Sequence, residues 1–247
     1  MTRFGIGQPV PRSEDTRLLR GAGRYTDDVR LPGQKVGYVL RSPHAHAILR
    51  GIDTADAAAM PGIHAILTAA DLRQAGIGPI PCVIPLRVRA GTDLHMKHRP
   101  VLADGHVRYV GEPVAFIVAD SLHEAMDAAD AVMVDYDALD AVVDTGAALS
   151  HAVRVHGDVP DNQAYDWEKG NQTATEQAFA TAVRTVRLDL INNRLSANPL
   201  EGRACVAEHD AAAGITRLTV GSQGVHDMRD MLARSEERRV GKECRSR

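Results

Sequence analysis

Cysteine, aromatic residues and long apolar runs are all scarce in this chain of 247 residues. Its three cysteines, Cys82, Cys205 and Cys244, form no CxxC pair, so we expect free, buried thiols and neither an iron–sulfur nor another metal site. Aromatic residues make up only 4% of the chain, so Val, Ala, Leu and Ile must build the core. No run approaches the roughly eighteen apolar residues of a membrane helix, which excludes a membrane span.

Signals for targeting and for nucleotide or nucleic-acid binding are also missing. Residues 1–17 contain no apolar stretch of the kind found in secretory signals, so we expect a cytoplasmic protein. No complete glycine fingerprint for a dinucleotide and no phosphate-binding GxxxxGK[ST] loop occurs. The sequence has no basic stripe with interleaved aromatics, so we expect no nucleic-acid partner.

The strongest pattern is VRYVGEPVAFIVAD at residues 107–120. The GEP turn leads into a short apolar run, residues 114–119, which predicts a buried strand. Asp120 or Ser121 then caps a helix, with Glu124 placed to complete a capping box. Residues 132–136 alternate and predict a second strand, so we expect a βαβ unit with both strands in one sheet and a mixed α/β (α+β) fold.

The remaining chain predicts further short elements. Leu122, Ala125, Met126 and Ala129 are spaced to bury one face of the central helix. Other strands are expected at residues 36–40, 45–52, 63–68, 186–190, 202–208 and 215–220, and other helices at 54–60, 69–75, 175–183 and from 225 onward.

Three segments together carry a family resemblance: GAGRYTDDVRLPG at 21–33, RSPHAHA at 41–47 and VRYVGEPVAFIVAD at 107–120. The chain resembles the N-terminal part of the molybdenum-binding large subunit of the xanthine dehydrogenase/aldehyde oxidase family. The resemblance is to the separate-subunit form of the family, as in carbon monoxide dehydrogenase large chains. The resemblance implies an N-terminal strap at 1–17, a hammerhead-like α/β domain at 18–149, a linker at 150–170, and the truncated start of a molybdopterin cofactor-binding domain at 171–233.

The last fourteen residues, 234–247, read RSEERRVGKECRSR and differ in composition from the rest. Six are basic and three are acidic, a net charge of +3. The peptide matches the translation of a common sequencing adapter, so we expect an artefactual tail on a truncated gene product.

For the parent protein, the resemblance implies an oxidoreductase that hydroxylates an aldehyde, an N-heteroaromatic ring or a similar carbon with water. Its cofactor would be molybdenum bound to a pyranopterin (the molybdopterin cofactor), and its substrate a small molecule. Partner subunits, an Fe–S small subunit and an FAD medium subunit, would carry electrons away. We expect no catalytic residue and no metal ligand in this chain, and no activity of the fragment alone. The alternative is a non-catalytic hammerhead-like assembly or interaction module.

The candidate cofactor-binding residues are Gln223 and Gly224, in the GSQG sequence of residues 221–224. This sequence lies at a predicted strand-to-helix turn, where small residues let a ligand approach the backbone. The resemblance implies that Gln223 donates a hydrogen bond to an oxo ligand of molybdenum. The alternative is a glutamine in a turn with no ligand.

Other polar residues predict structural roles. Glu201 and Arg203 are expected to lie on one face of an extended segment and to form a buried ion pair or an arginine contact. His44 and His46 are expected on one side of a strand, without a third metal ligand. Three further histidines are expected to be solvated, and the alternative is that they line a partner surface: His95, His98 and His106.

Overall fold

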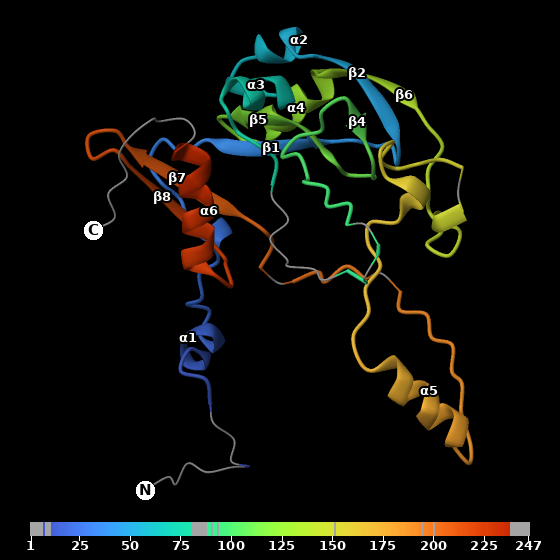
Figure 1. Cartoon of the computed structure of the whole chain (residues 1–247). Coiled ribbons are helices and arrows are strands. Elements are labelled where there is room, and N and C mark those ends of the chain that lie inside the picture. Colours follow the sequence, from blue (N-terminus) through green and yellow to red (C-terminus); the bar gives the residue numbers. More distant parts are fainter. Residues whose placement is uncertain are drawn as a thin grey trace, which may run out of the picture. The chain divides into compact units, whose positions relative to one another are not determined.

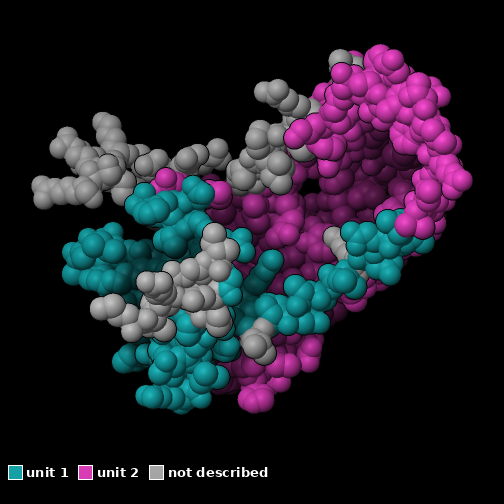
Figure 2. Space-filling model, turned by 90° about the horizontal axis from the view of Figure 1, so that it is seen from below, with its two compact units in different colours: residues 1–33, 190–229 teal, residues 34–189, 230–247 magenta. Residues whose placement is uncertain are grey.

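The computed structural model describes residue 7 and residues 11–237, apart from residues 81–87, 90, 93, 151, 194 and 200. The chain divides into two compact units, coloured separately in Figure 2. Unit 1 comprises residues 1–33 and 190–229, and unit 2 comprises residues 34–189 and 230–247. The domain boundaries expected from the sequence stay predictions. The expected tail lies outside the described residues from 238 onward.

Two three-stranded antiparallel sheets organise unit 2 (Figure 1). In the first sheet the order is β1-β5-β3, and in the second it is β4-β2-β6. The strands are β1 (Val36–Arg41), β2 (Ala47–Asp53), β3 (Ile63–Leu67), β4 (His106–Val107), β5 (Pro113–Ala119) and β6 (Met133–Ala138).

One apolar core cluster of unit 2 lies between the first sheet and the helices α2 (Ala55–Ala58) and α4 (Leu122–Ala131). A second cluster joins both sheets and consists of Ala47, Ala103, Val107 and Val114. Helix α3 (Ala69–Gln74) follows β3 and buries none of its residues. Figure 1 shows α3 and α4 near β5. Ile117, in the central strand β5, is fully buried and belongs to one cluster with small residues of α4. The α4 residues in this cluster are Ala125, Ala128, Ala129 and Ala131.

Helix α4 begins where the sequence predicts, but the residues that it packs against the sheet are smaller than expected. Ser121 caps it, because its hydroxyl oxygen accepts a hydrogen bond from the Glu124 N–H at 3.3 Å. The Glu124 carboxylate accepts from the Ser121 hydroxyl at 2.7 Å rather than from a backbone N–H, so the capping box is not completed. Leu122 and Met126 are exposed, because only the alanine face of the helix fits against the sheet.

The expected pairing of residues 114–119 and 132–136 in one sheet is wrong. Strand β5 pairs with β1 on one side and β3 on the other, so both of its edges are occupied. Strand β6 pairs instead with β2, in the second sheet. Helix α4 therefore connects two sheets rather than two neighbouring parallel strands. The mixed α/β (α+β) class is confirmed, but the βαβ unit is not.

Unit 1 contains a helix α1 (Asp15–Leu19) and a β-hairpin. The hairpin strands, β7 (Cys205–Asp210) and β8 (Ile215–Val220), pair antiparallel in register. Helix α6 (Val225–Glu237) follows after the turn at residues 221–224, and unit 1 includes it as far as residue 229. Cys205 is a free cysteine as expected, but it is exposed rather than buried because β7 and β8 form a sheet of only two strands. The other two cysteines lie outside the described residues.

The segment after residue 170 has little tertiary packing. Helix α5 (Gln172–Thr181), which belongs to unit 2, buries none of its residues. Residues 186–190 form no strand, so this sequence prediction is wrong. The alternation of Val186, Leu188 and Leu190 suits a strand, but the described residues give this segment no neighbouring strand to pair with.

Three short 3₁₀ turns complete the described structure: Thr26–Asp28, Ala148–Ser150 and Pro160–Asn162. Every helix in the described part of the chain is too short or too polar to cross a bilayer. The cytoplasmic location stays a prediction.

Candidate functional site

The turn between β8 and α6 holds the candidate residues Gln223 and Gly224. The Gly224 N–H donates to the Ser222 hydroxyl at 3.1 Å, and the Gly224 carbonyl accepts from the Met228 N–H at 3.0 Å. These bonds close the turn and start the helix without using the Gln223 side chain. Gln223 is exposed, and the described residues contain no hydrogen-bond partner for its amide. The amide is therefore available to a ligand.

Glycine keeps both ends of this turn small. A Cβ atom at Gly224 would lie 3.3 Å from an oxygen of Asp227, and one at Gly221 would lie 3.8 Å from the Glu201 carboxyl group. Neither glycine has the left-handed backbone that excludes other residues. The proposed role of these glycines, which is to let a ligand approach the backbone, stays a prediction.

Glu201 makes a different contact from the one expected. Its Oε1 accepts hydrogen bonds from the backbone N–H and the hydroxyl of Thr26, at 3.1 and 3.2 Å. Thr26 is buried, while Glu201 and Arg203 are exposed, and the described residues show no ion pair between these two. The expected buried ion pair is wrong, because the carboxylate is turned towards the Thr26–Asp28 turn within unit 1. Thr26 was missed as its partner, although it lies in the YTDD part of a segment that carries the resemblance.

His44 and His46 have structural contacts. Both residues precede β2 rather than lie in it, so the expected strand placement is wrong. The His44 ring lies 4.7 Å from the Tyr136 ring, between centroids, and His46 Nδ1 is 2.9 Å from the carbonyl oxygen of Asp140. No metal-binding group of histidines, cysteines and carboxylates occurs among the residues described.

The three histidines expected to be solvated differ from one another. His98 is exposed, whereas His95 and His106 are partly buried. Burial, followed by the positive charge of Arg108, lowers the pKa of His106. The prediction of a solvated His106 is therefore wrong, because β4 places it against β2.

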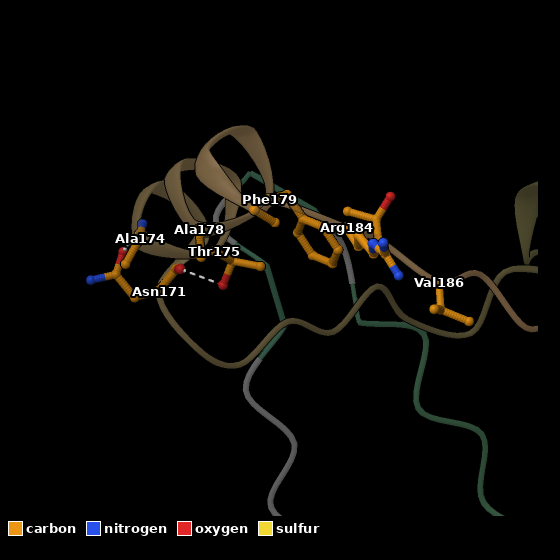
Figure 3. Close-up of a pocket in the computed structure, with 9 residues that line it drawn as sticks. Asn171, Ala174, Thr175, Ala178, Phe179, Arg184 and Val186 are labelled. Carbon is orange, nitrogen blue, oxygen red and sulfur yellow. Dashed lines mark hydrogen bonds between the residues drawn. The ribbon is translucent and has the colours of Figure 1, made fainter.

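An open hollow of about 520 Å³ lies beside helix α5 (Figure 3). In Figure 3 the Phe179 ring points along the chain towards Arg184. Thr175 donates from its hydroxyl to the Asn171 carbonyl oxygen at 2.8 Å, at the start of the helix. The lining is mainly apolar, and Arg184 is its only charged residue. The hollow therefore offers an uncovered apolar face, not a set of catalytic groups.

Two family models match the chain in the order expected from the sequence. The aldehyde oxidase and xanthine dehydrogenase a/b hammerhead domain matches residues 20–140, and the molybdopterin cofactor-binding domain matches residues 155–239. The chain belongs to the aldehyde oxidase and xanthine dehydrogenase family. Both sheets of unit 2 fall within the hammerhead match, and the turn with Gln223 falls within the cofactor-domain match.

Two large subunits of other enzymes are similar to this chain along almost its whole length. The chain is 35% identical to the nicotine 6-hydroxylase large subunit of Paenarthrobacter nicotinovorans, over 94% of this chain and 28% of that protein. It is also 35% identical to the carbon monoxide dehydrogenase large chain of Afipia carboxidovorans, over 93% of this chain and 29% of that protein. The chain thus spans less than a third of the length of these relatives.

Solved structures of family members agree with the described fold. Quinoline 2-oxidoreductase from Pseudomonas putida 86 matches with a TM-score of 0.77 at 35% identity, over 93% of this chain and 28% of that chain. The Cu,Mo-CO dehydrogenase matches with a TM-score of 0.79 at 34% identity, over 94% of this chain and 29% of that chain. The same architecture is thus found in both proteins.

Proposed function

We propose that this chain is the N-terminal part of a molybdenum hydroxylase large subunit. The whole protein would be an oxidoreductase that hydroxylates an aldehyde, an N-heteroaromatic ring or a similar activated carbon with water. The observation that carries this proposal is the match of a hammerhead domain and a molybdopterin cofactor-binding domain in sequence order. Relatives named as hydroxylases and dehydrogenases support the oxidoreductase class.

Gln223 and Gly224 are the residues of this chain that we propose to contact the cofactor. The Gln223 amide is an exposed, neutral donor, which can bond to an oxo ligand without changing the charge of the site. Gly224 keeps the backbone accessible beside it. When bound, the molybdenum cofactor supplies the redox centre that takes electrons from the substrate. In this proposal, the role of the chain is to bind and orient the cofactor.

Electrons would leave through an Fe–S small subunit and an FAD medium subunit. The relatives are named as a large subunit, a large chain and a subunit of a dehydrogenase complex, which supports a multi-subunit assembly. None of the candidate residues in this chain is a catalytic acid, base or nucleophile. We therefore expect no substrate turnover by residues 1–247 alone.

The test is to sequence the genomic locus past residue 233, express the complete reading frame with its partner subunits, and assay dye reduction. We expect an open frame, bound molybdenum and reduction that depends on an aldehyde or N-heteroaromatic substrate. The 247-residue chain with the same partners should show none. A stop codon near residue 233 would instead favour the assembly module, and turnover by the short chain would contradict the assignment of its residues.

Substitution of Gln223 tests the proposed contact in the complete enzyme. We expect Gln223→Ala to lower molybdenum content or activity about 10- to 100-fold, the usual cost of losing an outer hydrogen-bond partner of a metal site. The matched control is Gln74→Ala, an exposed glutamine at the end of α3 in the hammerhead part. Equal activity of both variants would show that Gln223 is only a turn residue.

A further inference from the structure

Three segments of unit 1 meet at the end of the β-hairpin opposite its connecting loop. Cys205 and Val220 form the last pair of the β7–β8 ladder, so residues 201–204 and 221–224 leave the hairpin at the same end. The Thr26–Asp28 turn lies against the same strand, β7. The proposed cofactor turn, residues 221–224, therefore has two neighbours in one compact unit, and one of them comes from a distant part of the sequence.

Thr26 needs a hydrogen-bond acceptor that its own turn does not supply. The first N–H groups of a helical turn have no partner within the turn, and Thr26 is only 8% exposed, so water has little access to its N–H. Glu201 Oε1 accepts from both the N–H and the hydroxyl of Thr26, at 3.1 and 3.2 Å. Hydrogen bonds to an ionised carboxylate are roughly twice as strong as neutral ones, so this contact fixes the Glu201 side chain.

The same carboxyl group lies next to the proposed cofactor turn. From the position of a Cβ atom on Gly221, the carboxyl carbon and both carboxyl oxygens of Glu201 are each 3.8 Å away. Because the three distances are equal, the flat face of the carboxyl group is turned towards Gly221. Gly221 is two residues before Gln223, and the hydrogen bonds that close the turn lie on its helix side. Glu201 thus contacts the turn on its strand side.

We propose that Glu201 is a positioning residue for Gln223. Held by Thr26, its carboxyl group supports the start of the turn at Gly221, so that the Gln223 amide keeps the orientation in which it donates to the cofactor. This inference rests on the proposed function and deepens it. Glu201 acts through Gln223 and not on the cofactor itself.

NMR relaxation of the 247-residue chain tests the support of the turn without any cofactor. Glu201→Ala should lower the backbone order parameters of residues 221–223 from about 0.85, which is typical of rigid backbone, to below about 0.6. Glu201→Gln keeps an oxygen that can accept both hydrogen bonds from Thr26, so it should retain most of the order. Unchanged order parameters in Glu201→Ala would overturn the proposal, and so would an equal fall in both variants.

The matched control is Glu208→Ala, which removes a glutamate of β7 that forms an ion pair with Arg217. It should leave the order parameters of residues 221–223 as they are in the unaltered chain, and a fall as large as that in Glu201→Ala would count against the specific role of Glu201. If Glu201→Ala does not fold, Thr26→Val removes one of the two hydrogen bonds and should give a smaller fall. Thr26→Ser keeps the hydroxyl and should restore the order. Equal values in these two variants would overturn the proposal.

Measurements on the complete enzyme separate this inference from the proposed function. Glu201→Ala should lower molybdenum content or activity, and the double variant with Gln223→Ala should lose no more than Gln223→Ala alone, because both changes break the same contact. Losses that multiply would show that Glu201 does not act through Gln223, and would overturn the positioning role. Full molybdenum content and activity in Gln223→Ala would instead refute the cofactor contact of the proposed function, even where the order parameters show that Glu201 holds the turn.

Discussion

Residues 36–138 and residues 171–195 use similar local patterns with opposite outcomes. In the first region the apolar strand β5 lies between two partner strands, and Ile117 is fully buried. In the second, Leu188 remains 75% exposed and the alternating residues form no strand. The two regions differ in whether a neighbouring strand is present to form backbone hydrogen bonds. A pattern of alternation becomes a strand only where another edge accepts its backbone hydrogen bonds.

The missing partners have a natural explanation under the proposed function. The chain spans less than a third of the length of its relatives. Residues that cover the apolar face of α5 and segment 186–190 would then come from the remaining length of the large subunit. Four predictions test the contrast between the two regions.

The largest expected effect is on solubility. Replacement of Val186, Leu188 and Leu190 together by serine should raise the soluble fraction of the chain severalfold, because exposed apolar stretches associate with one another. Centrifugation and light scattering measure this. An unchanged soluble fraction would show that these three exposed side chains do not cause the chains to associate.

The second prediction concerns stability. Ile117→Ala should lower the free energy of unfolding of unit 2 by about 3 kcal/mol, because it leaves a cavity in the core. Leu188→Ala should change it by less than about 0.5 kcal/mol, because this side chain is mostly exposed. Urea denaturation measures both. Equal losses would contradict the division into packed and unpacked regions, and Ile117→Val serves if the alanine variant does not fold.

Helix caps offer a third, smaller test. Ser121 caps α4, and Asn171 caps α5 by accepting from the Ala174 N–H at 3.0 Å. Ser121→Ala should cost about 1 kcal/mol of global stability, since α4 belongs to the core. Asn171→Ala should leave global stability unchanged and lower only the exchange protection of α5. A global loss in Asn171→Ala would show that α5 is packed.

The smallest effect is expected at the surface of unit 2. Asp120 accepts from Lys35 and from His64, the latter at 2.9 Å, and these hydrogen bonds lower the pKa of its carboxyl group. The contribution is present above the unfolded pKa of about 3.9 and is lost as pH falls through the lower folded value. Asp120→Asn should therefore lower Tm slightly at pH 7, with the difference closing in acid. Asp127→Asn, on the exposed side of α4, is the control.

Within the hammerhead region, the sequence was sufficient for most of the elements, although the short strand β4 was missed. Expected strands at residues 36–40, 63–68 and 114–119 correspond to β1, β3 and β5, and the cap at Ser121 is confirmed. These predictions depend on short-range signals, namely turns, alternation and capping residues. The resemblance also led to the family correctly, on segments whose order and spacing match it.

Apart from the strand expected at residues 186–190, the predictions that failed concern which segments of the chain contact one another. Nothing local in residues 114–136 shows that β5 already has two partners, so β6 must join another sheet. Likewise, nothing between residues 198 and 203 shows that Glu201 accepts hydrogen bonds from Thr26, far earlier in the chain. The assignment of Gln223 as a residue that contacts the molybdenum cofactor stays a prediction.

Both sheets of unit 2 draw all their strands from residues 36–138. During synthesis, every hydrogen-bonding edge needed by β5 has therefore left the ribosome before β5 itself emerges. Under the proposed function, the hammerhead core would close before the rest of the large subunit is translated. The later segments of such a protein would then emerge from the ribosome beside a hammerhead domain that has already folded.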